Sequence, residues 1–223
     1  MSEAVASSST SKDLADQLEN RKNRRNAPAK FAHVVLKTPR FEEMIAWYIT
    51  VLDAIEMYHD DNLCFITYDD EHHRVGFVRV PSVVRFPGVL LSKKRKILGP
   101  DHVAYTYATL SDLVGTYRRL ADMDIRPVWC INHGPTTSLY YEDPDGNRLE
   151  LQYDNYPSPE DLTVYLKGGD FDDNPVGVEF DPDVLERRLN QGVELSELIK
   201  RGSAPPDHGR ARSGKEALRW KTI

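Results

Sequence analysis

An internal repeat constrains the fold of this 223-residue chain more than any other feature of the sequence. Shifting the chain by 69 residues places a second copy on the first without gaps through its first half. The matched pairs are His33 with His102, Glu43 with Asp112, Tyr48 with Tyr117 and Asp53 with Asp122. Chance similarity of two amphipathic helices is the competing explanation, and a histidine at the same place in both copies argues against it.

Each copy predicts one strand, one helix and three further strands. In the first copy, β-branched and aromatic runs predict strands at 31–38, 54–60, 62–69 and 73–80, and apolar residues at helical spacing predict a helix at 39–53. The second copy predicts strands at 101–108, 127–132, 137–143 and 147–154 and a helix at 110–123. We therefore predict an α+β fold of two tandem βαβββ modules. Their strands are expected to form one curved, partly closed mixed sheet around a metal site.

The predicted domain covers residues 29–153, with module one at 30–81, a linker at 82–100 and module two at 101–153. The linker is long, so a substrate lid is the alternative interpretation of it. Residues 1–28 are rich in serine and charge and are expected to form a flexible arm. Residues 154–223 are expected to be a C-terminal extension with one helix at 182–201, which Gly192 could interrupt.

Composition excludes several classes of protein. A formal net charge of −6 does not suit binding to nucleic acid phosphates. The sequence has no apolar run long enough to span a bilayer and no apolar signal core near its start. Its two cysteines, Cys64 and Cys130, are too few for a disulfide framework. A cytoplasmic protein is therefore expected, and a homodimer is the assembly to test first because symmetric dimers are the commonest.

Three residues have the properties expected of metal ligands. Divalent iron that binds both substrate and oxygen needs two imidazoles and one carboxylate on one face, with the other positions open. His33 and His102 occupy equivalent strands of the two copies. Glu150 lies between two leucines in a predicted strand, so it points away from the face that the leucines bury. Each histidine alone could be an ordinary surface or core residue, but the set predicts the metal ligands His33, His102 and Glu150.

At this point the sequence resembles a known family. The segments FAHVVLKT at 31–38, PDHVAYTY at 100–107 and HGPTTSLYYEDPDGNRLELQY at 133–153 are similar to the ligand strands of the vicinal oxygen chelate superfamily. This superfamily includes glyoxalase, bleomycin resistance proteins and extradiol dioxygenases. The resemblance covers about residues 30–154 and is greatest to the type I extradiol ring-cleavage dioxygenases. It implies an Fe(II) enzyme, with Mn(II) as the alternative metal, that cleaves a catecholic ring with O2.

The same resemblance implies three further site residues. His133 would accept a proton from the substrate and later return it, and Tyr140 would hydrogen-bond a substrate oxygen. His73 would stabilise negative charge that develops on the oxygen side, with His72 as the competing choice. Trp47, Phe77 and Trp129 are candidates for an aromatic wall around the ring.

Two other functions remain open on the same scaffold. A glyoxalase-like isomerase, lyase or thiol transferase generally has a fourth ligand, a carboxylate, on the last strand of module one. The segment VGFVRVP at 75–81 contains neither aspartate nor glutamate, which favours the three-ligand site. A non-catalytic protein that binds a small ligand is the third hypothesis, and the complete ligand set argues against it.

Overall fold

The computed structural model describes residues 30–81, 100–156, 158–207 and 211–213. The chain divides into an N-terminal unit that ends at His33 and a second unit that begins at Val34, and the second unit contains both modules. The predicted arm and all of the predicted linker except Pro100 lie outside the described residues. Every helix in the described part of the chain is too short or too polar to pass through a lipid bilayer.

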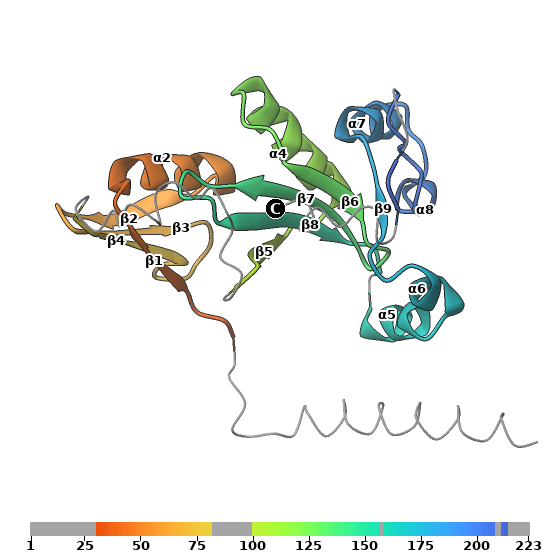
Figure 1. The fold of residues 1–223 in the computed structure, drawn as a ribbon, viewed down its shortest axis with the longest axis horizontal. Coiled ribbons are helices and arrows are strands. Elements are labelled where there is room, and N and C mark those ends of the chain that lie inside the picture. Colours follow the sequence, from red (N-terminus) through yellow and green to blue (C-terminus); the bar gives the residue numbers. More distant parts are fainter. Residues whose placement is uncertain (1–29, 82–99, 157, 208–210, 214–223) are drawn as a thin grey trace, which may run out of the picture. The chain divides into compact units, whose positions relative to one another are not determined.

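Module one is a four-stranded sheet with a helix on one face (Figure 1). Its elements are β1 (Val34–Thr38), α2 (Phe41–Leu52), β2 (Ile55–His59), β3 (Leu63–Thr67) and β4 (Val75–Arg79). The strand order is β1-β4-β3-β2, with β1 parallel to β4 and the other pairs antiparallel. Helix α2 ends where Asp53 adopts a left-handed conformation with φ of 51°, which turns the chain into β2.

Module two repeats this arrangement. Its elements are β5 (His102–Thr106), α4 (Leu110–Asp122), β6 (Trp129–Asn132), β7 (Thr136–Glu142) and β8 (Arg148–Asp154). The order is β5-β8-β7-β6-β9, where β9 (Val178–Glu179) is a short strand from the C-terminal extension. The Thr109 hydroxyl caps α4 by accepting a hydrogen bond from the Asp112 backbone N–H.

The α+β fold with two βαβββ modules is therefore confirmed, and α2 and α4 begin 69 residues apart as the repeat requires. The expectation of one continuous sheet is wrong, because the hydrogen-bonded strands form two sheets. In the described residues, β1 pairs with β4 and β5 pairs with β8, and no ladder joins β1 to β5. Side chains connect the modules instead, since one hydrophobic cluster contains buried residues from both helices and both sheets.

Alternation along the strands decides which side chains enter this core. On β8, Leu149 and Leu151 are 1% and 0% exposed and belong to the shared cluster. Met44 of α2 and Leu113 of α4 are fully buried in the same cluster. Burying a side chain of this size contributes about 1.5–3 kcal/mol. Side chains on the helix-facing side of each sheet are therefore buried in the core, and functional side chains are expected on the opposite side.

A buried hydrogen bond joins α2 to the β7–β8 turn. The Tyr48 hydroxyl donates to Asp143 Oδ2 at 3.1 Å, and both residues are buried. Asp143 also accepts hydrogen bonds from Asn147, so it keeps partners when Tyr48 is changed. We expect Tyr48→Phe to lower the free energy of unfolding by about 1 kcal/mol, measured by urea denaturation.

Tyr58→Phe is the matched control for this prediction. Tyr58 donates to Asp60 in the same way, at 2.6 Å, but on the exposed surface, where water replaces the lost partner. Equal losses in the two variants would contradict the assigned role of the Tyr48 hydrogen bond.

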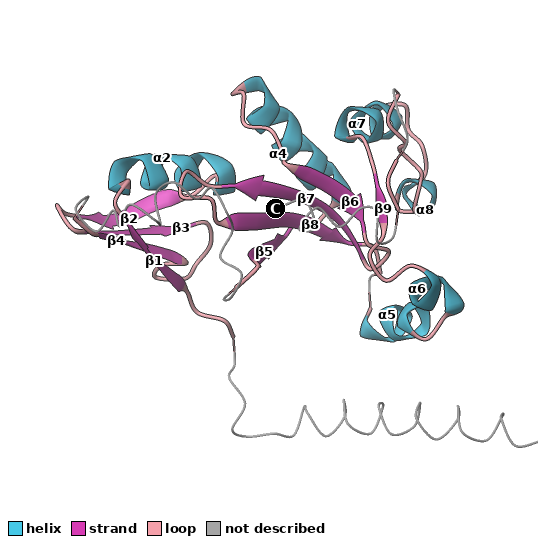
Figure 2. Ribbon diagram, viewed as in Figure 1, coloured by secondary structure: helices cyan, strands magenta, loops and turns pink. Residues whose placement is uncertain are grey.

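The prediction of one helix in the C-terminal extension is wrong (Figure 2). The extension contains α5 (Pro159–Leu166), α6 (Gly169–Asp173), β9, α7 (Pro182–Asn190) and α8 (Leu195–Leu198). The segment expected to form a single helix at 182–201 is divided between α7 and α8. Gly192, with φ of 76°, lies at the break, in the left-handed conformation that glycine tolerates best.

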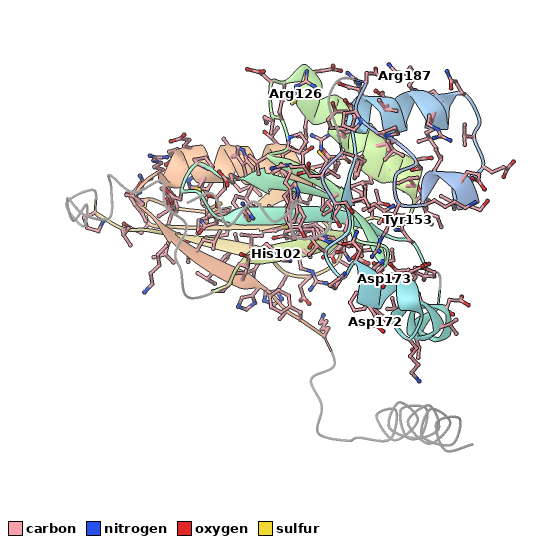
Figure 3. The ribbon with its side chains drawn as sticks, turned by 45° about the vertical axis from the view of Figure 1, so that its right-hand side comes forward. His102, Arg126, Tyr153, Asp172, Asp173 and Arg187 are labelled. Carbon is pink, nitrogen blue, oxygen red and sulfur yellow. The ribbon has the colours of Figure 1, made fainter. Side chains whose placement is uncertain are left out.

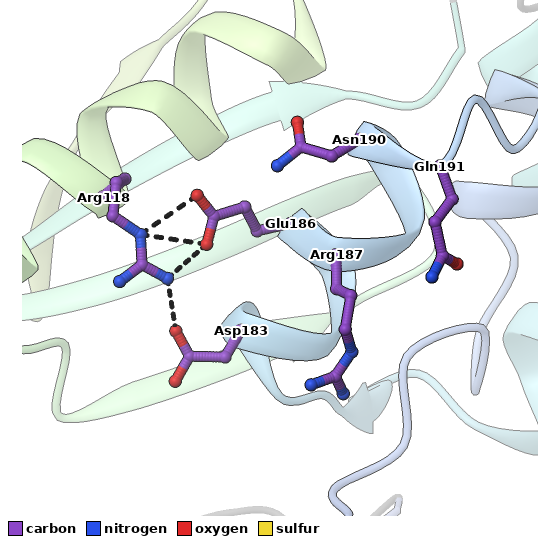
Figure 4. A pocket seen from close by; sticks show the side chains of 6 residues that line it. All are labelled: Arg118, Asp183, Glu186, Arg187, Asn190 and Gln191. Atoms are coloured by element: carbon purple, nitrogen blue, oxygen red, sulfur yellow. Dashed lines mark hydrogen bonds and ion pairs between the residues drawn. The ribbon is translucent and has the colours of Figure 1, made fainter.

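Charged side chains attach the extension to module two (Figure 4). The Arg118 guanidinium on α4 donates to both carboxylate oxygens of Glu186 and to Asp183, both on α7. These residues line an open pocket between the two helices. Because Arg118 pairs with Glu186 and Asp183 inside the pocket and Arg187 pairs with Asp207 of the extension, we interpret it as an attachment point and not as a ligand site.

Candidate metal centre

Three neighbouring strands present the candidate site on the face of module two opposite the core. Glu150 lies between Leu149 and Leu151 on β8, so alternation turns its carboxylate away from the core. Tyr140 on β7 is its antiparallel register partner, and residues directly opposite each other share a face. His102 begins β5, the parallel neighbour of β8 (Figure 3).

His102 and Glu150 meet directly. The distance from His102 Nε2 to Glu150 Oε2 is 3.0 Å, and Glu150 is only 4% exposed. On the other side of the ring, His102 Nδ1 lies 2.9 Å from Asp101 Oδ2. With Nδ1 facing Asp101, Nε2 faces Glu150, and the Nε2–H that hydrogen-bonds Glu150 without a metal would give way to a cation. This is the arrangement in which an outer carboxylate orients a metal-binding histidine.

Hydrogen bonds around the pair favour ionised Glu150. Burial alone would raise the pKa of the Glu150 carboxyl, but hydrogen bonds from His102, Ser138 and Tyr140 hold that pKa below its ordinary value. The hydrogen bond to Glu150 raises the pKa of His102, against the opposing effect of burial. The site therefore stabilises a carboxylate anion that is available to a cation.

Tyr140 connects this pair to His133. The Tyr140 hydroxyl lies 3.0 Å from His133 Nε2, and the Tyr140 and His102 rings are 5.4 Å apart, edge to face. Desolvation raises the pKa of Tyr140, so the hydroxyl keeps its proton at neutral pH. Four of the predicted site residues, His102, His133, Tyr140 and Glu150, are thus gathered on one face.

The C-terminal extension orients His133. The Nδ1 of His133 hydrogen-bonds the Val176 carbonyl oxygen, which only accepts, so Nδ1 carries a proton. Burial lowers the pKa of His133, which favours the neutral ring. In the neutral ring Nε2 is therefore an acceptor, and it faces Tyr140.

An aromatic wall borders this face. The Trp129 ring lies 4.9 Å from Tyr140 and 5.8 Å from His133, and its Nε1–H donates to Glu179 of β9 at 3.0 Å. Of the three aromatic residues expected to form the wall, Trp129 lies beside the predicted site residues. Phe77 is fully buried on the core side of β4, so its prediction as a wall residue is wrong.

The other two predicted site residues lie outside this group of four. His33 is exposed, immediately precedes β1 and closes the N-terminal unit, so its place as third ligand stays a prediction. His73 lies two residues before the start of β4 and is buried, and its ring stacks on Phe65 with centroids 4.2 Å apart. The competing His72 is exposed and meets His73 edge to face, at 4.4 Å.

The described donors fit a divalent metal. Nε2 of an oriented imidazole and a buried carboxylate oxygen are the ligand types that iron, manganese and zinc accept. Hydrogen bonds and the nearby His102 ring stabilise the buried Glu150 carboxylate. A cation held by His102 and Glu150 would take over part of this stabilisation.

Comparison with known proteins identifies the family. A family model described as the Glyoxalase/Bleomycin resistance protein/Dioxygenase superfamily matches residues 30–151. The chain belongs to this superfamily. Among curated members, biphenyl-2,3-diol 1,2-dioxygenase 2 from Rhodococcus globerulus is 47% identical over 174 residues, or 77% of this chain and 87% of the relative. Biphenyl-2,3-diol 1,2-dioxygenase 3 from the same organism is 41% identical over 175 residues, or 78% and 90%.

Solved structures also match this chain. A fosfomycin resistance protein from Listeria monocytogenes is 15% identical, with a TM-score of 0.46, and covers 62% of this chain and 99% of that one. The superfamily predicted from the sequence is confirmed by the family match. The predicted dioxygenase activity agrees with both curated relatives.

Sequence reasoning missed several partners of the site. Ser138 could have been found, because it lies two residues before Tyr140 on the same strand face. Asp101 precedes a predicted ligand, but acidic neighbours are too common to carry a prediction. The Val176 carbonyl and Glu179 come from distant sequence, and no local pattern indicates them.

Proposed function

We propose that this chain is an extradiol-type dioxygenase that uses O2 to open the ring of a catecholic substrate. The names of both curated relatives describe an aromatic 2,3-diol oxygenated at positions 1 and 2, which places the cleaved bond beside the diol. One structural observation carries the proposal: His102, Glu150, Tyr140 and His133 line one strand face next to Trp129. Aromatic diols of the biphenyl-2,3-diol type are the proposed substrate class.

The proposed metal is Fe(II), with Mn(II) as the alternative, held by His33, His102 and Glu150. When bound, the metal would lower the pKa of the diol and bring substrate and oxygen together at its open positions. The contact with Asp101 would orient the His102 ring so that Nε2 is free to bind the metal. Ser138 and Tyr140 hold the Glu150 carboxylate through hydrogen bonds.

His133 is the proposed proton acceptor. Its Nδ1–H is held by the Val176 carbonyl, so the proton of a substrate hydroxyl goes to Nε2. The single Tyr140 hydroxyl proton, which either His133 Nε2 at 3.0 Å or Glu150 can accept, would be donated instead to a substrate oxygen and so orient the ring. His133 returns the proton after the bond cleaves. The proposed role of His73 is to stabilise negative charge on the oxygen side of the substrate.

Anaerobic reconstitution tests the activity. The protein would be loaded with Fe(II), mixed with a panel of catechols and biphenyl-type diols, and followed for oxygen uptake and a yellow ring-opened product. We expect stoichiometric oxygen uptake with at least one diol, loss of activity in air and recovery with ascorbate. Zinc- or nickel-dependent turnover of methylglyoxal with glutathione, without oxygen uptake, would instead support the isomerase.

Gly177 tests whether the extension positions His133. Gly177 has φ of 117°, and a Cβ there would lie 2.3 Å from the Asn132 carbonyl oxygen and 2.7 Å from His133 Cα. Gly177→Ala must therefore shift the 176–178 segment, including the carbonyl that holds Nδ1. We expect a lower kcat with unchanged iron content, by about 10-fold if one hydrogen bond worth about 1.4 kcal/mol is lost.

Gly192→Ala is the control for this positioning test. Gly192 also has a positive φ, 76°, but a Cβ there meets no atom within 4 Å. Alanine at this position has the same kind of backbone strain from a positive φ, but its Cβ does not collide with another atom. Equal kcat values for the two variants would refute positioning by the extension.

The location and assembly remain predictions. Cytoplasmic location rests on Cys64 and Cys130, which form no disulfide in the described part of the chain. A homodimer is supported by the exposed apolar side chains of Ile55, Met57 and Tyr58 on the edge strand β2. Sedimentation equilibrium would measure the assembly directly.

A further inference from the structure

A second group of metal-ligating side chains lies on the β2–β3 hairpin, in a different sheet from His102 and Glu150. One ligand atom each of Glu56, His59 and Cys64 lies within 4.8 Å of the other two. His59 Nδ1 is 2.9 Å from Glu56 Oε2. His59 and Cys64 are antiparallel register partners, so their side chains share the α2 face of the sheet.

A β-bulge completes this group. Residues three apart on a regular strand point to opposite faces, which would separate Glu56 from His59. The register shifts between Glu56 and Tyr58, so that Glu56 pairs with Ile66 while His59 pairs with Cys64. Ile66 and Cys64 are two residues apart and share a face. The one extra residue therefore turns Glu56 to the side of His59 and Cys64.

The Cys64 thiol is buried within this group. Its side chain is 0% exposed, and Cys64 forms no disulfide. In the described part of the chain its sulfur has no hydrogen-bond partner. Burial and the charges of Glu56 and Glu42 raise the pKa of the Cys64 thiol to about 12, so it is a poor nucleophile at neutral pH. A role as a reactive cysteine is thereby disfavoured.

Glu42 supports His59 from the other side of the ring. Glu42 Oε2 lies 3.6 Å from His59 Nε2, while its other oxygen pairs with Arg79 at 2.5 Å. A histidine that binds a metal through one nitrogen commonly donates its other N–H to a carboxylate. With Nδ1 toward Glu56 and Nε2 toward Glu42, the His59 ring has this orientation.

We propose that Glu56, His59 and Cys64 bind a Zn(II) ion, with Glu42 as the outer carboxylate that orients His59. A mixed sulfur, nitrogen and oxygen donor set suits zinc, and one solvent molecule would complete a tetrahedral site. On binding, a Zn–S bond forms and the thiol proton passes to solvent. The ion would stabilise the edge strand β2, which among the described strands pairs with β3 alone, and would link the hairpin to α2 through Glu42.

Cobalt(II) is the probe that separates this site from the proposed catalytic metal. The predicted ligands His33, His102 and Glu150 contain no sulfur, so a sulfur-to-cobalt charge-transfer band reports the hairpin alone. Co(II) would be titrated anaerobically into metal-free, reduced, full-length protein. We expect the band to saturate at one equivalent and to disappear when Zn(II) is added.

Four variants define the outcome. Cys64→Ser and His59→Gln should abolish the band, and Glu42→Gln should weaken Co(II) binding by about 10- to 100-fold. Cys130→Ser removes the other cysteine and should leave the band unchanged. His59 is partly exposed, so His59→Gln keeps the test valid if Cys64→Ser folds poorly. Absence of the band in the wild-type protein, or its loss in Cys130→Ser alone, would overturn the proposal.

Discussion

We expect the replacement of Glu150 with alanine to abolish metal retention and ring cleavage together. Glu150 Oε2 lies 3.0 Å from His102 Nε2, and its carboxylate is buried and held ionised by three hydrogen bonds. Loss of an outer hydrogen-bond partner typically costs about 10- to 100-fold in metal affinity, so loss of a ligand should cost more. Because substrate and oxygen are proposed to meet at the metal, activity should fall with metal content. His102→Ala should behave in the same way.

Iron content after anaerobic gel filtration is the measurement, followed by the oxygen-uptake rate of the same sample. Glu142→Ala is the matched control, since Glu142 lies on the neighbouring strand but is exposed and paired only loosely with Arg148 at 3.7 Å. This variant should keep both iron and activity. A Glu150→Ala protein that retains stoichiometric iron would refute the ligand assignment.

Replacing His133 with alanine should leave iron bound and lower kcat by about 10²- to 10⁴-fold, the usual contribution of a general acid or base. The His133 ring contacts the Tyr140 hydroxyl and is oriented by the Val176 carbonyl. Removing the imidazole should therefore leave His102 and Glu150 in place. Tyr140→Phe should also keep iron when Fe(II) is supplied in excess, because His102 and Ser138 still hold the Glu150 carboxylate. Its kcat should fall by about 10- to 100-fold, as expected for one hydrogen bond to a charged oxygen worth about 1.5–3 kcal/mol.

The pH dependence of kcat/KM would test the proposed role of His133 as the base. A base acts in its unprotonated form, and burial lowers the pKa of His133 from its ordinary value of 6.5. The neutral ring therefore persists to lower pH, and the rising limb of kcat/KM should lie below about 6.5. This limb should be absent in His133→Ala. Loss of iron from His133→Ala, or an unchanged limb, would contradict the proton-acceptor role.

The sequence predicted the parts of the site that lie on repeated or alternating strands. The 69-residue shift placed His102 on the first strand of module two, and the flanking leucines predicted the direction of Glu150. Tyr140 and Glu150 are ten residues apart across a tight turn, so their pairing follows from local hairpin geometry. Strong local periodicity made these predictions possible.

The remaining features depend on contacts between distant segments. Val176 and β9 reach β6 only because the extension folds back, and short elements such as α6 and α8 have too few turns to leave a periodic pattern. The division into two sheets depends on which strand edges pair, and alternation within one strand does not specify its neighbour. The β2 bulge likewise reverses the face of Glu56 in a way that a regular alternating pattern does not predict.

The most direct test of the account is a crystal structure of the protein loaded with Fe(II) under anaerobic conditions, with anomalous diffraction collected at the iron edge. The account predicts an iron peak bonded to His102 Nε2 and Glu150, with His33 as the third protein ligand and His133 and Tyr140 beside the open positions. An iron peak away from Glu150, or a site that His133 and Tyr140 do not approach, would contradict it.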